Sequence, residues 1–250
     1  MSFPKRVLIA VTDYSGVLYD DGSKTGLFLS EAYDPFKVFS GAGFDIQFIS
    51  ENGKFGYDPH SLESKFASEE CLAAHKNPKS PYSLVVDGIL PAAEIIAANY
   101  SIFFACGGHG ALFDFVDAPH LGKVAADIYA NGGIVSAVCH GPAIFNSIKD
   151  AEGVPIVKDK TITGFAPKGE VEMGVVGALK KHHLKLVPEI AEDNGATYMA
   201  PPTPFEDFTI TDERILTGAN PQSSITLSDN IVQLWNAIDA PTQSGASVLK

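Results

Sequence analysis

A cysteine stands at the end of a strongly apolar segment of this chain. Residues 134–138 read Ile-Val-Ser-Ala-Val, and Cys139, His140, Gly141 and Pro142 follow directly. This pattern predicts a strand, a sharp turn and the start of a helix, with the thiol held above the sheet edge. Amides of the first helical turn and the helix dipole would favour a thiolate at Cys139. Because His140 can carry protons near neutral pH, the pair indicates nucleophilic cysteine chemistry.

A glycine-rich segment offers groups that could hold negative charge. Residues 107–110 read Gly-Gly-His-Gly and follow a second apolar run. The N–H of Gly108, paired with the N–H of His140, would form an oxyanion hole. Cys106 precedes this turn, so we interpret it as a core thiol. The same structural interpretation competes for Cys139, because free cysteine is commonly buried.

The remaining histidines do not form a recognisable metal motif. His109, His120 and the pair His182-His183 lack i, i+4 partners and a nearby pair of cysteines. We therefore expect solvated or structural roles for them, and no required metal. The sequence contains neither a phosphate loop nor a dinucleotide fingerprint, so we expect no cofactor.

Alternating strands and helices must position these groups. Helical stretches at 27–41 and 121–131 separate apolar segments that we interpret as strands, namely 7–11, 44–49, 102–105 and 134–138. This alternation predicts an α/β fold with a mainly parallel sheet and helices on both faces. Function in such folds gathers at the carboxyl ends of the strands, where both the glycine cluster and Cys139 fall.

Length and composition predict one globular domain. The chain has 250 residues, of which 45% are hydrophobic and 19% charged, and no linker-like segment divides it. We expect a single domain over residues 1–240, with an excursion from the core fold at about 55–99. The small, polar residues 241–250 would form a frayed tail.

The charge of the chain excludes several classes of partner. A formal net charge of −12 opposes binding to nucleic acid and to anionic membrane surfaces. No apolar run reaches the roughly 18 residues that a transmembrane helix needs, and the N-terminus lacks a signal-peptide pattern. Three irregularly spaced cysteines fit reduced thiols better than disulfides. We therefore expect a cytoplasmic protein, and leave open whether it is also nuclear.

The motifs together resemble a known family. Residues 104–110 and 137–143 look like the ThiJ/PfpI superfamily, within the class I glutamine-amidotransferase-like fold. Residues 24–31, 50–56 and 162–170 are similar to its fungal heat-shock chaperone branch, whose members are glutathione-independent glyoxalases. The resemblance covers about residues 5–236. It implies a flavodoxin-like α/β sandwich and a homodimer.

The resemblance also implies roles for two acids that the sequence would otherwise place on solvated helix surfaces. Glu170 would orient His140 and stabilise its imidazolium, completing a catalytic set with Cys139. Glu31 would be the carboxyl that contacts the sulfur of the nucleophile, with a hydrogen bond or a proton as its contribution.

The activity implied by the resemblance is glyoxalase III, a lyase of the hydro-lyase class with a role in stress protection. It would convert methylglyoxal and water to lactate through Cys139, without glutathione. A cysteine hydrolase acting as a peptidase, amidase or protein deglycase could use the same triad. A holdase chaperone that binds unfolded client proteins is an alternative from another class.

Overall fold

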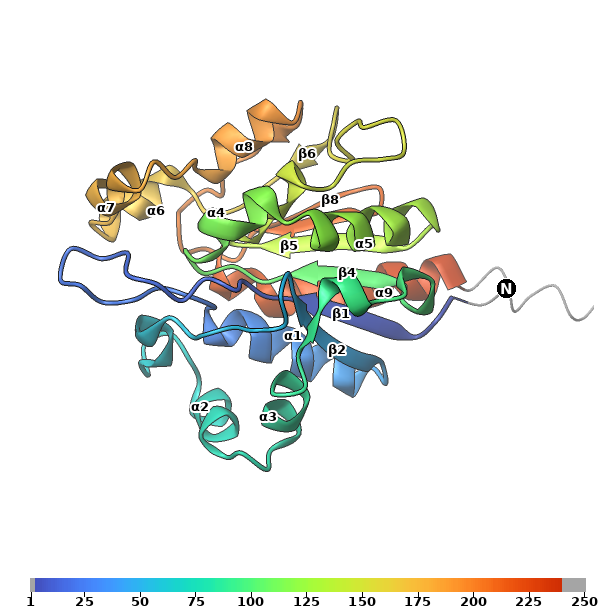
Figure 1. Ribbon diagram of the computed structural model, residues 1–250, viewed down its shortest axis with the longest axis horizontal. Coiled ribbons are helices and arrows are strands. Elements are labelled where there is room, and N and C mark those ends of the chain that lie inside the picture. The colour runs from blue at the N-terminus through green and yellow to red at the C-terminus, as the bar shows by residue number, and fades with distance from the viewer. Residues whose placement is uncertain (1–2, 240–250) are drawn as a thin grey trace, which may run out of the picture.

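A seven-stranded sheet runs through the centre of the computed structural model, which describes residues 3–239 (Figure 1). Its order is β3-β2-β1-β4-β5-β9-β8, and β8 alone runs antiparallel to its neighbour. The strands of this sheet are β1 (Arg6–Ala10), β2 (Asp45–Ser50), β3 (Leu90–Pro91), β4 (Ile102–Ala105), β5 (Ile134–Val138), β8 (Thr209–Asp212) and β9 (Ile215–Gly218). Two further strands, β6 (Thr161–Ile162) and β7 (Thr197–Tyr198), form a small parallel sheet.

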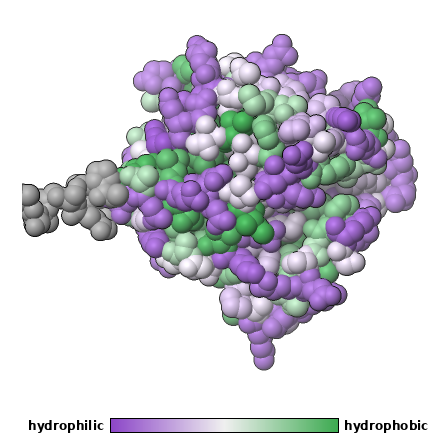
Figure 2. Space-filling model, turned by 180° about the vertical axis from the view of Figure 1, so that it is seen from behind, coloured by the Kyte–Doolittle hydropathy of each residue, from purple (hydrophilic) through white to green (hydrophobic). Residues whose placement is uncertain are grey.

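Helices cover both faces of the main sheet. The α-helices are α1 (Leu29–Gly41), α2 (Glu69–Lys76), α3 (Pro81–Val86), α4 (Ala111–Asp114), α5 (Pro119–Ala130), α6 (Pro167–Glu172), α7 (Val176–Lys181), α8 (Val187–Asp193) and α9 (Ser224–Asp239). In Figure 1, α4 and α5 lie in front of the sheet and α1 and α9 behind it. Seen from that opposite side, hydrophobic residues are interspersed among hydrophilic ones (Figure 2).

Burial on both faces explains why the central strands are almost continuously apolar. Successive residues of a strand point to opposite faces. In β4, Phe103 packs into the core beneath α5, whereas Phe104 packs into the core beneath α1, where its ring meets Phe39 edge-on. The α/β fold predicted from the alternation of strands and helices is confirmed.

The sheet brings the two chemistry-bearing segments to one edge. Strands β4 and β5 are parallel neighbours, with Ala105 opposite Ala137. The chain therefore leaves both strands at the same level, so that residues 106–110 and 139–142 meet there. This is the carboxyl edge that the sequence predicts for the site.

Several elements differ from the prediction in detail. The helices expected at 27–41 and 121–131 are α1 and α5, displaced by a residue or two at their ends. The excursion at 55–99 holds α2 and α3, but it also supplies the edge strand β3, so it belongs partly to the main sheet. The small β6-β7 sheet and the β8-β9 hairpin were not predicted. The expected tail at 241–250 lies outside the described residues. Within residues 3–239, no helix is long and apolar enough to cross a membrane.

Candidate active site

Cys139 occupies a strained bend directly after β5. Its φ is 58°, in the left-handed region that side chains with a Cβ rarely adopt. The helix predicted after the turn is a short 3-10 helix, Gly141–Asn146, with Pro142 in its first turn. Gly141 is required here, because a Cβ at this position would lie 2.4 Å from the carbonyl oxygen of Ala105. The Cys-His-Gly-Pro sequence therefore builds a tight elbow.

Cys139, His140 and Glu170 form a continuous buried chain of polar contacts. The sulfur of Cys139 lies 3.3 Å from Nδ1 of His140, and Nε2 of His140 lies 2.8 Å from Oε1 of Glu170. Glu170 reaches the elbow from the first turn of α6. A proton on Nε2 donates to the carboxylate and leaves Nδ1 free to accept the thiol proton. The three residues that the sequence analysis combined thus lie together in the order that proton transfer requires.

Charges and burial set the resting protonation states of Glu170 and His140. Burial alone would raise the pKa of Glu170, but the imidazoles of His140 and His109 outweigh it and lower the pKa to about 2. Burial lowers the pKa of His140, and the nearby His109 acts in the same direction. At neutral pH an ionised Glu170 therefore lies beside a neutral His140.

The thiol of Cys139 is not held as a thiolate at rest. Cys139 is only 3% exposed, and this burial raises the pKa of its thiol well above the ordinary value. The Glu31 carboxyl raises it further, whereas the Gly108 amide opposes the shift. The expected thiolate-favouring effect of the turn is therefore outweighed by desolvation, and the following 3-10 helix is short. The base nearest to the thiol is Nδ1 of His140, 3.3 Å from the sulfur.

Glu31 lies in the first turn of α1 and is fully buried. Its Oε2 accepts a hydrogen bond of 2.7 Å from the N–H of Gly107. Burial raises the pKa of Glu31 to about 8, so the carboxyl is mostly protonated at neutral pH. Its Oε1 has no hydrogen-bond partner of ordinary geometry among the described residues, although Cys139 lies close enough for thiol and carboxyl to interact. A neutral carboxyl can therefore donate to the sulfur once the thiol loses its proton.

The glycine pair after β4 fits closely against the site. Gly108 has a φ of 95°, and a Cβ there would lie 2.2 Å from the carbonyl oxygen of Gly26. A Cβ at Gly107 would lie 2.6 Å from Oε2 of Glu31 and 2.7 Å from the backbone nitrogen of His140. Only glycine allows this approach, which places the Gly108 amide against the sulfur of Cys139.

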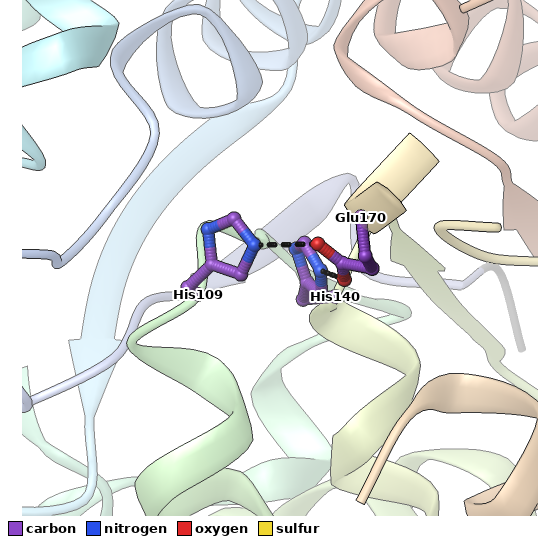
Figure 3. A group of neighbouring side chains, drawn as sticks. All are labelled: His109, His140 and Glu170. Atoms are coloured by element: carbon purple, nitrogen blue, oxygen red, sulfur yellow. Dashed lines mark hydrogen bonds and ion pairs between the residues drawn. The ribbon is translucent and has the colours of Figure 1, made fainter. Parts of the chain in front are cut away.

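His109 belongs to the site, although the sequence analysis did not place it there. It is only 5% exposed, and its Nε2 lies 3.0 Å from Oε2 of Glu170. In Figure 3, dashed lines join the Glu170 carboxylate to the imidazoles of both His109 and His140. Of the solvated or structural roles expected for His109, burial rules out the solvated one. The sequence feature that could have identified His109 as a site residue was its position within the glycine cluster at the end of a strand.

The other candidate residues lie elsewhere. Cys106 is fully buried and its thiol donates to the carbonyl oxygen of Glu31, as expected for a core thiol. His120 is exposed and bonds Glu51 at the beginning of α5. His182 packs against the ring of Phe113.

Three side chains of the site carry atoms that could act as metal ligands. The ligand atoms of His109, His140 and Glu170 lie within 4.8 Å of one another. Both Nε2 atoms already face a carboxylate oxygen of Glu170, so hydrogen bonding alone accounts for their arrangement. The absence of a required metal stays a prediction.

A small cavity of about 50 Å³ opens onto Cys139, Gly108 and both imidazoles. Its wall is mainly aromatic and apolar, formed by Phe28, Phe66, Phe165, Met173, Phe205 and Pro221. This space accommodates a molecule of few heavy atoms and surrounds the reacting groups with low-dielectric side chains.

The family of the chain follows from its sequence. A sequence model of the DJ-1/PfpI family matches residues 25–234. The chain belongs to this family. The ThiJ/PfpI resemblance drawn from the two strand-end motifs is therefore confirmed.

Relatives of this DJ-1/PfpI protein include fungal enzymes. It is 46% identical over 222 residues to the glutathione-independent glyoxalase HSP31 of Saccharomyces cerevisiae, covering 88% of this chain and 94% of the relative. It is 43% identical over 228 residues to glyoxalase 3 of Candida albicans, covering 91% and 97% of the two chains. The crystal structure of glyoxalase III from Candida albicans superposes with a TM-score of 0.89 and covers 92% of this chain and 96% of that one.

Proposed function

We propose that this protein is a glutathione-independent glyoxalase that converts methylglyoxal and water to lactate at Cys139. The observation that carries the proposal is the buried Cys139–His140–Glu170 chain at the floor of a cavity sized for a small molecule. Relatives that are 43% and 46% identical over nearly their whole length bear the name of this activity. Such an activity would make the protein a lyase that protects against reactive dicarbonyls.

The first half of the reaction attaches the substrate to the thiol. The proton of Cys139 moves to Nδ1 of His140, and Glu170 stabilises the resulting imidazolium. The thiolate attacks the aldehyde carbon, and a hemithioacetal forms as the carbonyl electrons move to oxygen. The amides of Gly108 and His140 would hold this oxyanion until the imidazolium protonates it.

The second half moves a hydrogen and releases the product. Neutral His140 removes the hydrogen on the former aldehyde carbon as a proton and delivers it to the oxygen of the neighbouring carbon, giving an enediol. His140 then takes the hydroxyl proton on the former aldehyde carbon and delivers it to the neighbouring carbon, as the electrons of the C=C bond move to that carbon and a C=O bond forms. This leaves a thioester on Cys139. Water then attacks the thioester carbonyl, so that the C–S bond breaks, lactate leaves and the thiol is restored. The carbonyl carbon that is reduced and the aldehyde carbon that is oxidised belong to one molecule, so no external oxidant or reductant is needed.

Cavity size favours this reaction over the hydrolase alternative. A peptidase or protein deglycase with the same triad must admit a segment of polypeptide to the sulfur of Cys139. The cavity of about 50 Å³, walled by four phenylalanines, suits a compact dicarbonyl better.

A holdase function has weaker support than the enzyme. Exposed large hydrophobic side chains, such as Val17, Leu84, Ile96, Met199 and Ile225, come from separate parts of the chain. On the face seen in Figure 2, hydrophobic residues are interspersed among hydrophilic ones. Binding of client proteins, assembly as a homodimer and a cytoplasmic location stay predictions.

The proposal is tested by incubating the purified, reduced protein with methylglyoxal in the absence of glutathione and measuring lactate. A casein digest and a methylglyoxal-modified peptide serve as parallel substrates for the hydrolase alternative. Lactate formation from free methylglyoxal, with neither cleavage of the casein peptides nor loss of the adduct from the modified peptide, supports the proposal. Turnover of the peptides with no lactate would favour the hydrolase.

A further inference from the structure

A second imidazole shares the carboxylate that serves His140. Glu170 accepts from His140 through Oε1 at 2.8 Å and faces Nε2 of His109 through Oε2 at 3.0 Å (Figure 3). The rings of His109 and His140 have centroids 4.2 Å apart and are tilted by 37°. Both oxygens of one buried carboxylate are therefore engaged by the two imidazoles.

His109 is itself held from behind by an anchored tyrosine. The hydroxyl of Tyr19 lies 3.5 Å from Nδ1 of His109 and donates to Oδ2 of Asp58 at 2.8 Å. Asp58 is buried and also accepts from the Thr25 hydroxyl at 2.9 Å and from the His60 N–H at 2.9 Å. Because the Tyr19 hydroxyl is fixed by its hydrogen bond to Asp58, its contact with Nδ1 limits rotation of the His109 ring while Nε2 faces Glu170. Three segments far apart in the chain thus converge on one imidazole.

Geometry explains why the second contact matters. A carboxylate held through one oxygen can rotate about its side-chain bonds, and its hydrogen bond to His140 would then lengthen or bend. A donor on the other oxygen fixes the carboxylate plane. Because Glu170 determines which nitrogen of His140 carries the proton, fixing its plane keeps Nδ1 aimed at the sulfur of Cys139.

We propose that His109, supported by Tyr19 and Asp58, is a positioning residue that locks the Glu170 carboxylate and thereby keeps His140 ready to deprotonate Cys139. Its role is to donate a hydrogen bond, not to exchange protons with the substrate. The effect of His109 on turnover rests on the proposed glyoxalase function. Its effect on the thiol does not, because any electrophile that reaches Cys139 reports it.

The test compares four variants with the wild type: His109→Phe, His109→Gln, Tyr19→Phe and the exposed control His120→Gln. Two assays are run on folded protein, checked by circular dichroism and thermal unfolding. One measures the rate at which iodoacetamide alkylates Cys139, identified by peptide mass analysis. The other measures kcat and KM for lactate formation from methylglyoxal.

Loss of a charged hydrogen bond should slow both alkylation and kcat by about 10- to 100-fold in His109→Phe, with little change in KM. His109→Gln keeps an N–H donor toward Glu170 and should recover to within about threefold of the wild type. Tyr19→Phe should fall between them, and His120→Gln should match the wild type. Because Tyr19→Phe leaves His109 in place, it tests the arrangement even if His109→Phe does not fold.

Two results would overturn the proposal. Wild-type alkylation in folded His109→Phe, or in folded Tyr19→Phe, would show that the second contact does not position Glu170. Equal losses in His109→Gln and His109→Phe would show that the imidazole itself is needed. If the alkylation rates of the variants follow the predicted order but neither the wild type nor any variant forms lactate, the proposed function fails and the positioning role stands.

Discussion

The buried carboxyl of Glu31 should make the stability of the protein depend on pH. Its pKa is about 8 in the folded protein and 4.5 is its ordinary value, which approximates the unfolded chain. A folded pKa raised above the unfolded one means that the contribution to stability is fully present below about pH 4.5 and is lost as pH rises through 8. Each pKa unit corresponds to about 1.36 kcal/mol, so the whole loss is about 5 kcal/mol, of which about 4 kcal/mol falls between pH 5 and 9.

Glu31→Gln removes the ionisable group and keeps an oxygen that can accept from Gly107. The difference in unfolding free energy, variant minus wild type, should therefore grow by about 4 kcal/mol in favour of the variant between pH 5 and 9. Urea unfolding followed by circular dichroism, in reducing buffers at each pH, measures it. Taking the difference cancels the titration of histidines that both proteins share. The exposed helix residue Glu192 supplies the control, since Glu192→Gln should show a constant difference.

A constant difference for Glu31→Gln across this pH range would refute the reasoning. It would mean that Glu31 ionises as it does in water, and that the site does not hold a neutral carboxyl beside the sulfur of Cys139.

Three further predictions concern the elbow and its partners. Cys139→Gly and Cys139→Ala should both abolish lactate formation. The glycine variant should be the more stable by about 1 kcal/mol in urea unfolding, because glycine adopts the positive φ of this position without strain. Equal stability of the two variants would show that the bend is not strained. Glu170, whose folded pKa is depressed to about 2, contributes stability above about pH 4.5 that is lost as pH falls toward 2, so Glu170→Gln should cost up to about 3 kcal/mol at pH 7 and progressively less below pH 4.5. An acid titration in which the variant tracks the wild type at a fixed offset would oppose this assignment. Gly108→Ala should lose activity and lower the unfolding midpoint, since its Cβ would meet the Gly26 carbonyl at 2.2 Å; wild-type kcat in that variant would argue against the close fit.

Local sequence was sufficient to identify the elbow that holds the proposed nucleophile. Cys139 and His140 are adjacent, and the strand, the glycine and the proline around them lie within a few residues. The carboxyl edge at which they meet Gly108 follows from the parallel order of β4 and β5, which the alternation of strands and helices predicts. Fold class and elbow therefore come from patterns that a single sequence contains.

The sequence alone could not predict which residues far apart in the chain meet at the site. Glu31 and Glu170 are acids in first helical turns, and only the family resemblance distinguished them from solvated ones. His109 was missed because its partner Glu170 is 61 residues away, on a helix whose position no local pattern sets. The direction of the Cys139 pKa shift was also missed, because it depends on how completely the fold buries the thiol.

The most direct test of the account compares lactate formation from methylglyoxal, without glutathione, by the wild type, Cys139→Ala and Cys106→Ala. The last is a matched control, since Cys106 is a buried thiol that lies outside the proposed Cys139–His140–Glu170 set. With all three shown to be folded, we predict that the wild type and Cys106→Ala form lactate and that Cys139→Ala forms none. Lactate formation by Cys139→Ala at the wild-type rate would contradict the account.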